Sequence, residues 1–132
     1  MLYYIKRYPV SLFIIALVIY LSFFKPPQTD LDGIDGLDKL VHVVMYLGLS
    51  GVLWLEFLWG HRREQTPMWH AWIGAVLCPI LFSGVIELLQ AYCTEHRGGD
   101  CLDFAANTAG VLLAWCLATR VRRWSYFKSK SS

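Results

Sequence analysis

The stretch "DKLVHVVMYLGLSGVLWLEFLW", Asp38–Trp59, decides the fold of this chain. It is long and apolar enough for a helix that crosses the hydrocarbon core of a bilayer, which takes roughly 17–25 residues. Yet it begins with Asp38 and Lys39, and it carries His42 and Tyr46 one and two turns further on. Ionisable groups inside a membrane are costly unless they are paired or hydrated. Their presence therefore predicts either a functional site or a buried polar network.

Composition places the whole chain in a membrane. Apolar residues make up 56% of the 132 residues and charged residues only 17%, whereas a soluble domain carries about a quarter charged residues. We therefore expect a single all-α integral membrane domain over residues 1–132, with membrane lipids as partners and no nucleic acid. The four Cys residues include no CxxC pair and give no zinc-site signature.

Hydropathy predicts four spans packed as a four-helix bundle. The opening stretch supplies the span at about 39–59, and the others lie at about 9–25, 68–93 and 102–119. Pro79 lies in the middle of the third span, where its missing N–H should kink the helix. The first span also resembles a signal peptide, but only "SFFKPPQ" follows it and no small-x-small cleavage site. We therefore expect it to be retained.

The distribution of Lys and Arg predicts the orientation. The N-terminus, the loop between the second and third spans and the C-terminal tail share one side of a four-span protein. They hold nine of the twelve basic residues: Lys6, Arg7, Arg62, Arg63, Arg120, Arg122, Arg123, Lys128 and Lys130. The positive-inside rule then places both termini in the cytoplasm and the 25–38 and 94–101 loops outside. In a bacterium this is the cytoplasmic (inner) membrane.

Unusual polar residues converge on the outer ends of the second, third and fourth spans. Many are three or four positions apart, so they share a helix face. In chain order they are Asp38, Lys39, His42, Tyr46, Glu87, Gln90, Arg97, Asp100, Asp103 and Asn107. Gly84 and Gly110 on the same faces should let the helices approach closely. The pattern predicts a polar cavity that opens to the outer face.

Simpler interpretations exist for most of these residues taken singly. Asp38 precedes an apolar run and suits a helix N-cap, and His42 alone is typical of a packing residue. Glu87 is different, because an ionisable residue within a span marks a functional candidate. Glu56 and His70 lie at the inner interface, and we interpret them as solvated edge residues.

Two cysteines bracket the outer loop "TEHRGGD". A disulfide between Cys93 and Cys101 would close a short loop and fix Arg97 and Asp100, since the outer side of a bacterium with a periplasm is oxidising. A pair of free thiols is the equal alternative. Cys78 and Cys116 fall within spans and are expected to be packing residues.

Together these motifs resemble a known family. "DKLVHVVMYLGLS", "GVIELLQ" and "RGGDCLDFAANTAG" are similar to the pattern of VanZ-like membrane proteins, named for a teicoplanin-resistance protein. The resemblance covers about 38–110, and every position of the pattern is present. It implies a small multi-span protein of the cell envelope, linked in some relatives to glycopeptide-antibiotic resistance. It implies no settled reaction, and whether the chain is an enzyme stays open.

The first hypothesis of function is a site for a lipid headgroup or cell-wall intermediate that carries phosphate. Carboxylates would hold a divalent cation whose charge bridges to the phosphate; the candidate ligands are Asp38, Glu87, Asp100 and Asp103. Other side chains would bind the substrate: Lys39, Tyr46, Gln90, Arg97 and Asn107. For a reaction, the candidate catalytic residues are His42, Glu87 and Asp103, with His42 or Glu87 as the general base.

Two further hypotheses use the same residues. In one, the protein is a non-catalytic scaffold or partner-binding protein, and its charged side chains form a structural network whose disruption leaves buried charges unpaired. In the other, the residues begin a proton or ion path. The inner halves of the spans carry almost no matching acids, which disfavours the path.

Overall fold

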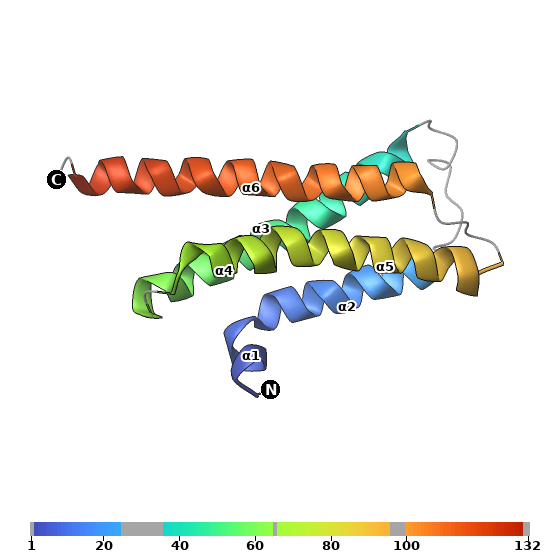
Figure 1. Cartoon of the computed structure of the whole chain (residues 1–132), viewed down its shortest axis with the longest axis horizontal. Coiled ribbons are helices and arrows are strands. Elements are labelled where there is room, and N and C mark those ends of the chain that lie inside the picture. The colour runs from blue at the N-terminus through green and yellow to red at the C-terminus, as the bar shows by residue number, and fades with distance from the viewer. Residues whose placement is uncertain (1, 25–35, 65, 96–99, 131–132) are drawn as a thin grey trace.

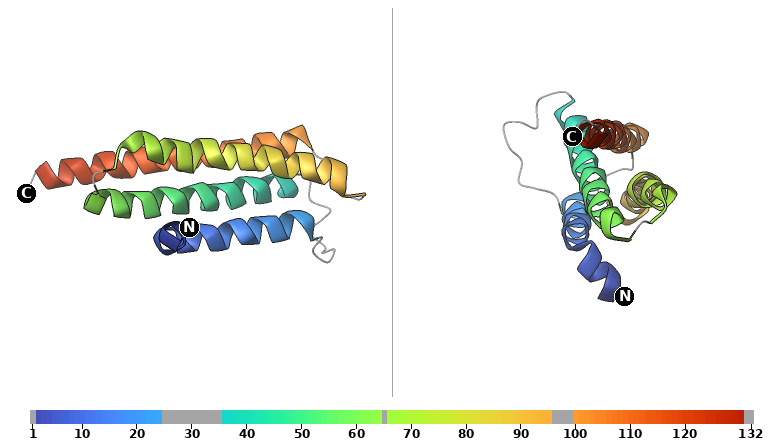
Figure 2. Two further views of the ribbon diagram at one scale, coloured as in Figure 1. Left: turned by 60° about the horizontal axis from the view of Figure 1, so that its bottom comes forward. Right: turned by 90° about the vertical axis from the view of Figure 1, so that its left-hand side faces the viewer.

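The computed structural model describes residues 2–24, 36–64, 66–95 and 100–130, and all regular elements in these ranges are helices. They are α1 (Leu2–Arg7), α2 (Pro9–Phe23), α3 (Leu37–Glu64), α4 (Met68–Trp72), the π-helical turn η2 (Ile73–Leu77), α5 (Cys78–Cys93) and α6 (Cys101–Lys130). The long helices run side by side, with the N-terminus and the C-terminus toward the same end (Figures 1 and 2). The expected all-α class is confirmed.

Three helical segments are long and apolar enough to cross a membrane. They are Leu37–His61, Met68–Cys93 and Cys101–Lys130, whereas the apolar helix Pro9–Phe23 is shorter, with 15 residues. The last segment continues well past the predicted end of the fourth span at 119. The residues from 120 to 130 include three Arg and two Lys, which are good helix formers, and no Gly or Pro. The helix therefore continues although the apolar stretch has ended.

The distortion expected at Pro79 occurs one turn earlier along the chain. The N–H of Cys78 donates to the carbonyl five residues back, at the start of η2. Pro79 has no N–H to donate to the carbonyl of Ala75, and the Ser50 hydroxyl of α3 donates to that oxygen at 2.5 Å instead. A side chain from the neighbouring helix thus satisfies the carbonyl group that proline leaves without a donor.

Gly110 sets the close approach of α6 to α3. A Cβ placed at Gly110 would overlap the carbonyl oxygen of Val43 and lie 2.9 Å from the backbone nitrogen of Leu47. The expected role of Gly110 is therefore confirmed. At Gly84 a Cβ would meet only the Phe104 ring, at the ordinary contact distance of 3.5 Å, so the helix contact there does not depend on glycine.

Side chains from neighbouring helices hold both ends of α2. The Glu56 carboxylate accepts hydrogen bonds from the N–H of Val10 (3.1 Å), the N–H of Ser11 (3.3 Å) and the Ser11 hydroxyl (2.5 Å). At the other end, Gln90 donates to the carbonyl of Ser22 at 2.7 Å. The interpretation of Glu56 as a solvated edge residue was wrong, because its carboxylate caps the first turn of α2, where free N–H groups attract an acceptor.

Candidate functional site

The predicted site residues gather where α3 and α6 begin and α5 ends. Helix periodicity places Asp38 and His42 on one face of α3, and Asp103 and Asn107 on the facing side of α6. Glu87 comes from α5, which runs in the direction that brings its last turns to the same end. Because α3 and α6 begin at this end and α5 runs antiparallel to both, polar groups from distant parts of the chain lie together in one place. We call these residues, with Lys39, Ser83 and Asp100, the polar cluster.

Lys39 is the cation of the polar cluster. Its ammonium donates to the carboxylates of Asp103, Asp100 (3.0 Å) and Asp38 (3.4 Å). The pairing holds α3 against the start of α6. It also occupies all three N–H donors of the ammonium, so in this structure Lys39 balances carboxylates and does not present a free clamp for a phosphate.

Asp100 caps α6. Its carboxylate accepts a hydrogen bond from the N–H of Leu102 at 2.9 Å, and its carbonyl accepts from the N–H groups of Asp103 and Phe104. The Leu102 N–H, together with the ammonium of Lys39, holds the pKa of the Asp100 carboxyl below its ordinary value. Asp100 was expected as a metal ligand, and the structure gives it this capping role.

A chain of hydrogen bonds runs from α3 through α6 to α5. Nδ1 of His42 lies 2.9 Å from Oδ1 of Asn107, whose amide group donates to Ser83 (2.8 Å) and Glu87 (3.4 Å). The other Glu87 oxygen accepts the N–H of Asp100 at 3.3 Å. Because the Asn107 amide nitrogen donates elsewhere, its oxygen is the acceptor for His42, so Nδ1 carries a hydrogen.

The remaining nitrogen of His42 faces two carboxylates. Nε2 lies 3.6 Å from Asp103 and 3.9 Å from Asp38. One ligand atom from each of these three residues lies within 4.8 Å of the other two, which is close enough to share a metal ion. The group that could hold a cation therefore differs from the predicted ligand set: it consists of Asp38, Asp103 and His42. The Glu87 carboxylate instead accepts hydrogen bonds from Asn107 and from the backbone N–H of Asp100.

The other predicted site residues differ in their placement. Tyr46 is 1% exposed, and its hydroxyl lies near Ser83 but has no hydrogen-bond partner of good geometry among the described residues. Gln90 is turned toward α2 and away from the polar cluster. Arg97 lies outside the described residues. Ser83 was not predicted, although its position four residues before Glu87 places both on one face of α5.

Two local predictions at this end are corrected. Gly36, with a φ of +84°, precedes α3, and its carbonyl accepts the N–H of Leu40, so Asp38 lies inside the first turn and is not the N-cap. Cys93 and Cys101 are free, exposed thiols at two separate helix ends, so the disulfide interpretation is wrong for this structure.

Comparison with known proteins identifies the family. No curated protein and no solved structure matches the chain. The model of the VanZ/LLP1 family matches residues 3–122, which include α1 except Leu2, α2 to α5, the whole polar cluster and most of α6. The match agrees with the motifs in the sequence and with the three helices that are long and apolar enough to cross a membrane. This chain is a membrane protein that belongs to the VanZ/LLP1 family.

Proposed function

We propose that the polar cluster binds a divalent cation through Asp38, His42 and Asp103, and that the cation holds the phosphate of a lipid headgroup. The observation that carries the proposal is the Nε2 lone pair of His42, which faces two carboxylate oxygens. Lys39 binds Oδ2 of Asp38 and Oδ1 of Asp103, whereas the oxygens that face Nε2 are the other two, Oδ1 of Asp38 and Oδ2 of Asp103. A positive charge placed among Nε2 and these two oxygens would be attracted by all three. A divalent cation supplies that charge and still has coordination positions for a ligand.

The donor set favours a particular kind of metal. One imidazole nitrogen with two carboxylate oxygens suits Zn²⁺ or Mn²⁺ better than Ca²⁺, which prefers oxygen ligands alone. Asn107 holds the other nitrogen of His42, and such an outer hydrogen bond fixes the ring of a metal-binding histidine in its tautomer. The arrangement around His42 is thus the one expected of a metal ligand.

The cation would also decide which ligands can enter. Asp38, Glu87, Asp100 and Asp103 outnumber Lys39 within the polar cluster, so a phosphate group would be repelled without additional positive charge. A bound cation reverses the local sign and offers open positions to phosphate oxygens. A lipid suits this depth, because its tail would remain in the bilayer beside the ends of the helices.

The placement of the helices supports an orientation for this site. We propose that α2 is a fourth span, since it is held by Glu56 near one end and by Gln90 near the other. Four spans would place both termini on one side of the membrane, and the direction in which both ends of the ribbon point supports this proposal (Figure 1). With the positive-inside rule, that side is the cytoplasm and the polar cluster faces outward from the inner membrane. Phosphate-bearing cell-wall lipids are then a suitable ligand class, and this is the proposed connection with glycopeptide resistance.

Metal and lipid measured together test the proposal. The purified protein would be analysed by native mass spectrometry as wild type, His42→Ala and Asp103→Asn, with His61→Ala as the matched control because His61 lies near the opposite end of α3 from the polar cluster. We expect one bound cation and a phosphate-bearing lipid that chelation releases in wild type and in the control, and neither the cation nor such a chelator-sensitive lipid in the two site variants. Chelation of the wild type should release the lipid. The proposal would be overturned if the wild-type protein still contains no metal after incubation with Zn²⁺ and Mn²⁺.

A second candidate function is favoured by the unbroken hydrogen-bond chain of His42, Asn107, Ser83 and Glu87. Such a chain also serves as a structural network in a scaffold protein, with a proton on His42 in place of the cation. In that case Asp103→Asn would lower the thermal unfolding temperature to the same extent with and without chelator. Under the cation proposal, the chelator lowers the stability of the wild type and leaves that of Asp103→Asn unchanged.

A further inference from the structure

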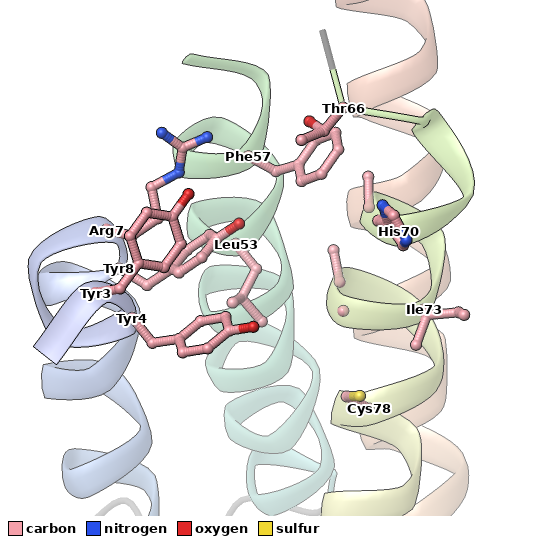
Figure 3. Close-up of a pocket in the computed structure, with 13 residues that line it drawn as sticks. Tyr3, Tyr4, Arg7, Tyr8, Leu53, Phe57, Thr66, His70, Ile73 and Cys78 are labelled. Carbon is pink, nitrogen blue, oxygen red and sulfur yellow. The ribbon is translucent and has the colours of Figure 1, made fainter. Parts of the chain in front are cut away.

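A cavity of about 610 Å³ lies at the end of the molecule opposite the polar cluster (Figure 3). Leu53 and Phe57 of α3 line one side of it, and Ile73 and Cys78 line the side formed by η2 and the start of α5. The first helix completes the rim with Tyr3, Tyr4, Arg7 and Tyr8. The lining thus has an apolar wall and a polar, aromatic rim.

The backbone keeps this cavity open on two sides. The chain breaks its helix at Tyr8, with φ −128° and ψ 52°, so α1 turns away from α2 and leaves a wedge beside α3. On the other side, Gly74 lies in the π-helical turn, and a Cβ placed there would meet no atom within 4 Å. Protein interiors are close-packed, and π-helical turns occur frequently at functional sites. The space is therefore one that a ligand can fill.

The lining indicates an amphiphilic anion. Arg7 is a permanent cation at the rim, and the buried Thr66 hydroxyl has no hydrogen-bond partner among the described residues. The residues that line the cavity carry no carboxylate, and the Arg7 guanidinium, which also packs against Gly60 of α3, keeps its positive charge and has five N–H donors. Arginine forms parallel hydrogen bonds with phosphate oxygens, while the walls at Leu53 and Ile73 suit a hydrocarbon chain. A ligand that fits the whole cavity thus has an anionic group for Arg7 and a hydrocarbon chain for the apolar wall.

We propose that this cavity binds an anionic phospholipid from the adjacent leaflet. The phosphate lies at Arg7 and Thr66, and one acyl chain lies along Leu53 and Ile73 beside Gly74. This site needs no metal ion and shares no residue with the polar cluster. It is therefore independent of the cation-dependent site proposed for the other end of the molecule.

Photo-crosslinking tests the proposal on the full chain in vesicles. The probes are phosphatidylglycerol and phosphatidylcholine, each with a photoactivatable diazirine in one acyl chain. Gly74→Leu fills the cavity, and Gly48→Leu is the matched control, because Gly48 is also surrounded by open space but does not line the cavity. In wild type and the control we expect phosphatidylglycerol to label the peptides that contain Leu53 and Ile73. In Gly74→Leu this labelling should fall at least fivefold.

The headgroup is tested separately with Arg7→Gln. This variant should reduce labelling by phosphatidylglycerol to the level of phosphatidylcholine and leave the phosphatidylcholine level unchanged. Equal labelling of wild type and Gly74→Leu would overturn the site, and equal labelling of wild type by the two lipids would overturn its anionic ligand. If Gly74→Leu does not fold, Leu53→Trp fills the cavity from α3 and carries the same expectation. Chelator should not change the labelling, which separates this site from the polar cluster.

Discussion

The carboxylate of Glu56 on α3 accepts the backbone N–H of Ser11 on α2 at 3.3 Å, although the two residues lie 45 positions apart in the chain. No side chain of the preceding segment caps α2, so this acceptor from another helix replaces a local N-cap. The contact ties the first turn of α2 to the second half of α3. The stability of α2 in the bundle should therefore depend on Glu56.

Replacing Glu56 by Ala should strongly destabilise the protein. The change removes the acceptor of three donors in the first turn of α2, two of which belong to the buried Ser11, and a buried donor left without a partner costs about 1–3 kcal/mol. Ser11→Ala removes only one of these donors and should cost less, about 0.5–1.5 kcal/mol. Thermal unfolding in detergent measures both, with Glu95→Ala as the exposed control. Equal unfolding temperatures for Glu56→Ala and Glu95→Ala would contradict this role.

Replacing Gly110 by Ala should separate α6 from α3. Its Cβ would overlap the Val43 carbonyl, a backbone atom that cannot move without shifting α3, and overpacking of this kind costs about 1–3 kcal/mol. Gly48→Ala is the control, because a Cβ there meets nothing within 4 Å and alanine favours the helix by up to about 1 kcal/mol. The two variants should shift the unfolding temperature in opposite directions. A shift of the same sign would show that the close approach at Gly110 is not required.

Replacing Asn107 by Leu should weaken cation binding although Asn107 is not a ligand. Leucine has a similar size but cannot hold Nδ1 of His42, and loss of such an outer hydrogen bond lowers metal affinity about 10–100-fold. Thr108→Val is the control on the same helix, because the Thr108 hydroxyl bonds only to the carbonyl of Phe104 in its own helix. Titration of the metal-free protein with Zn²⁺ measures both affinities. An unchanged affinity in Asn107→Leu would remove His42 from the proposed ligand set.

The charge of Asp100 should stabilise the protein at neutral pH and cease to do so in acid. The pKa of this carboxyl is held below its ordinary value of 3.8 by the N–H of Leu102 and the ammonium of Lys39. A carboxyl with a lowered folded-state pKa contributes stability above its unfolded pKa, and that contribution disappears as the pH falls through the folded value. Asp100→Asn keeps the capping oxygen and removes the charge. The unfolding temperatures of wild type and Asp100→Asn should therefore differ at pH 7 and converge below pH 3.8; a constant difference would contradict this.

Composition and helical spacing were enough to predict the membrane class, the family motifs and the gathering of the polar residues at one end of the helices. His42 and Asp103 lie on predictable faces near the starts of their helices, so their proximity follows once α3 and α6 pack parallel with their first turns at the same end. The partners of individual side chains could not be predicted in this way. Gln90 and Glu56 both bond to α2, a contact that depends on how far each helix is displaced along its neighbour, and no spacing within one helix encodes that displacement.

The capping of α6 shows the same limit on a smaller scale. Sequence alone shows Asp38, Asp100 and Asp103 as three similar carboxylates near helix starts. Their different roles depend on where the two helices begin: α3 begins after Gly36, and α6 begins after Asp100. A difference of one or two residues in a helix boundary thus decides whether an aspartate caps a helix or faces His42.

The π-helical turn determines which face of the segment Met68–Cys93 points toward the other helices before and after it. The segment's buried positions include a row at every fourth residue, Ala71, Ala75, Pro79, Ser83 and Glu87, and Val76, Ile86 and Gln90 are buried beside this row. In a regular α-helix such a series rotates by about 40° at each step, and the stripe would turn away from the bundle. The wider turn at Ile73–Leu77 offsets part of this rotation. Deleting one residue there would rotate Glu87 by roughly 100° relative to Ala71, so the two ends of the protein keep their alignment through a single irregular turn.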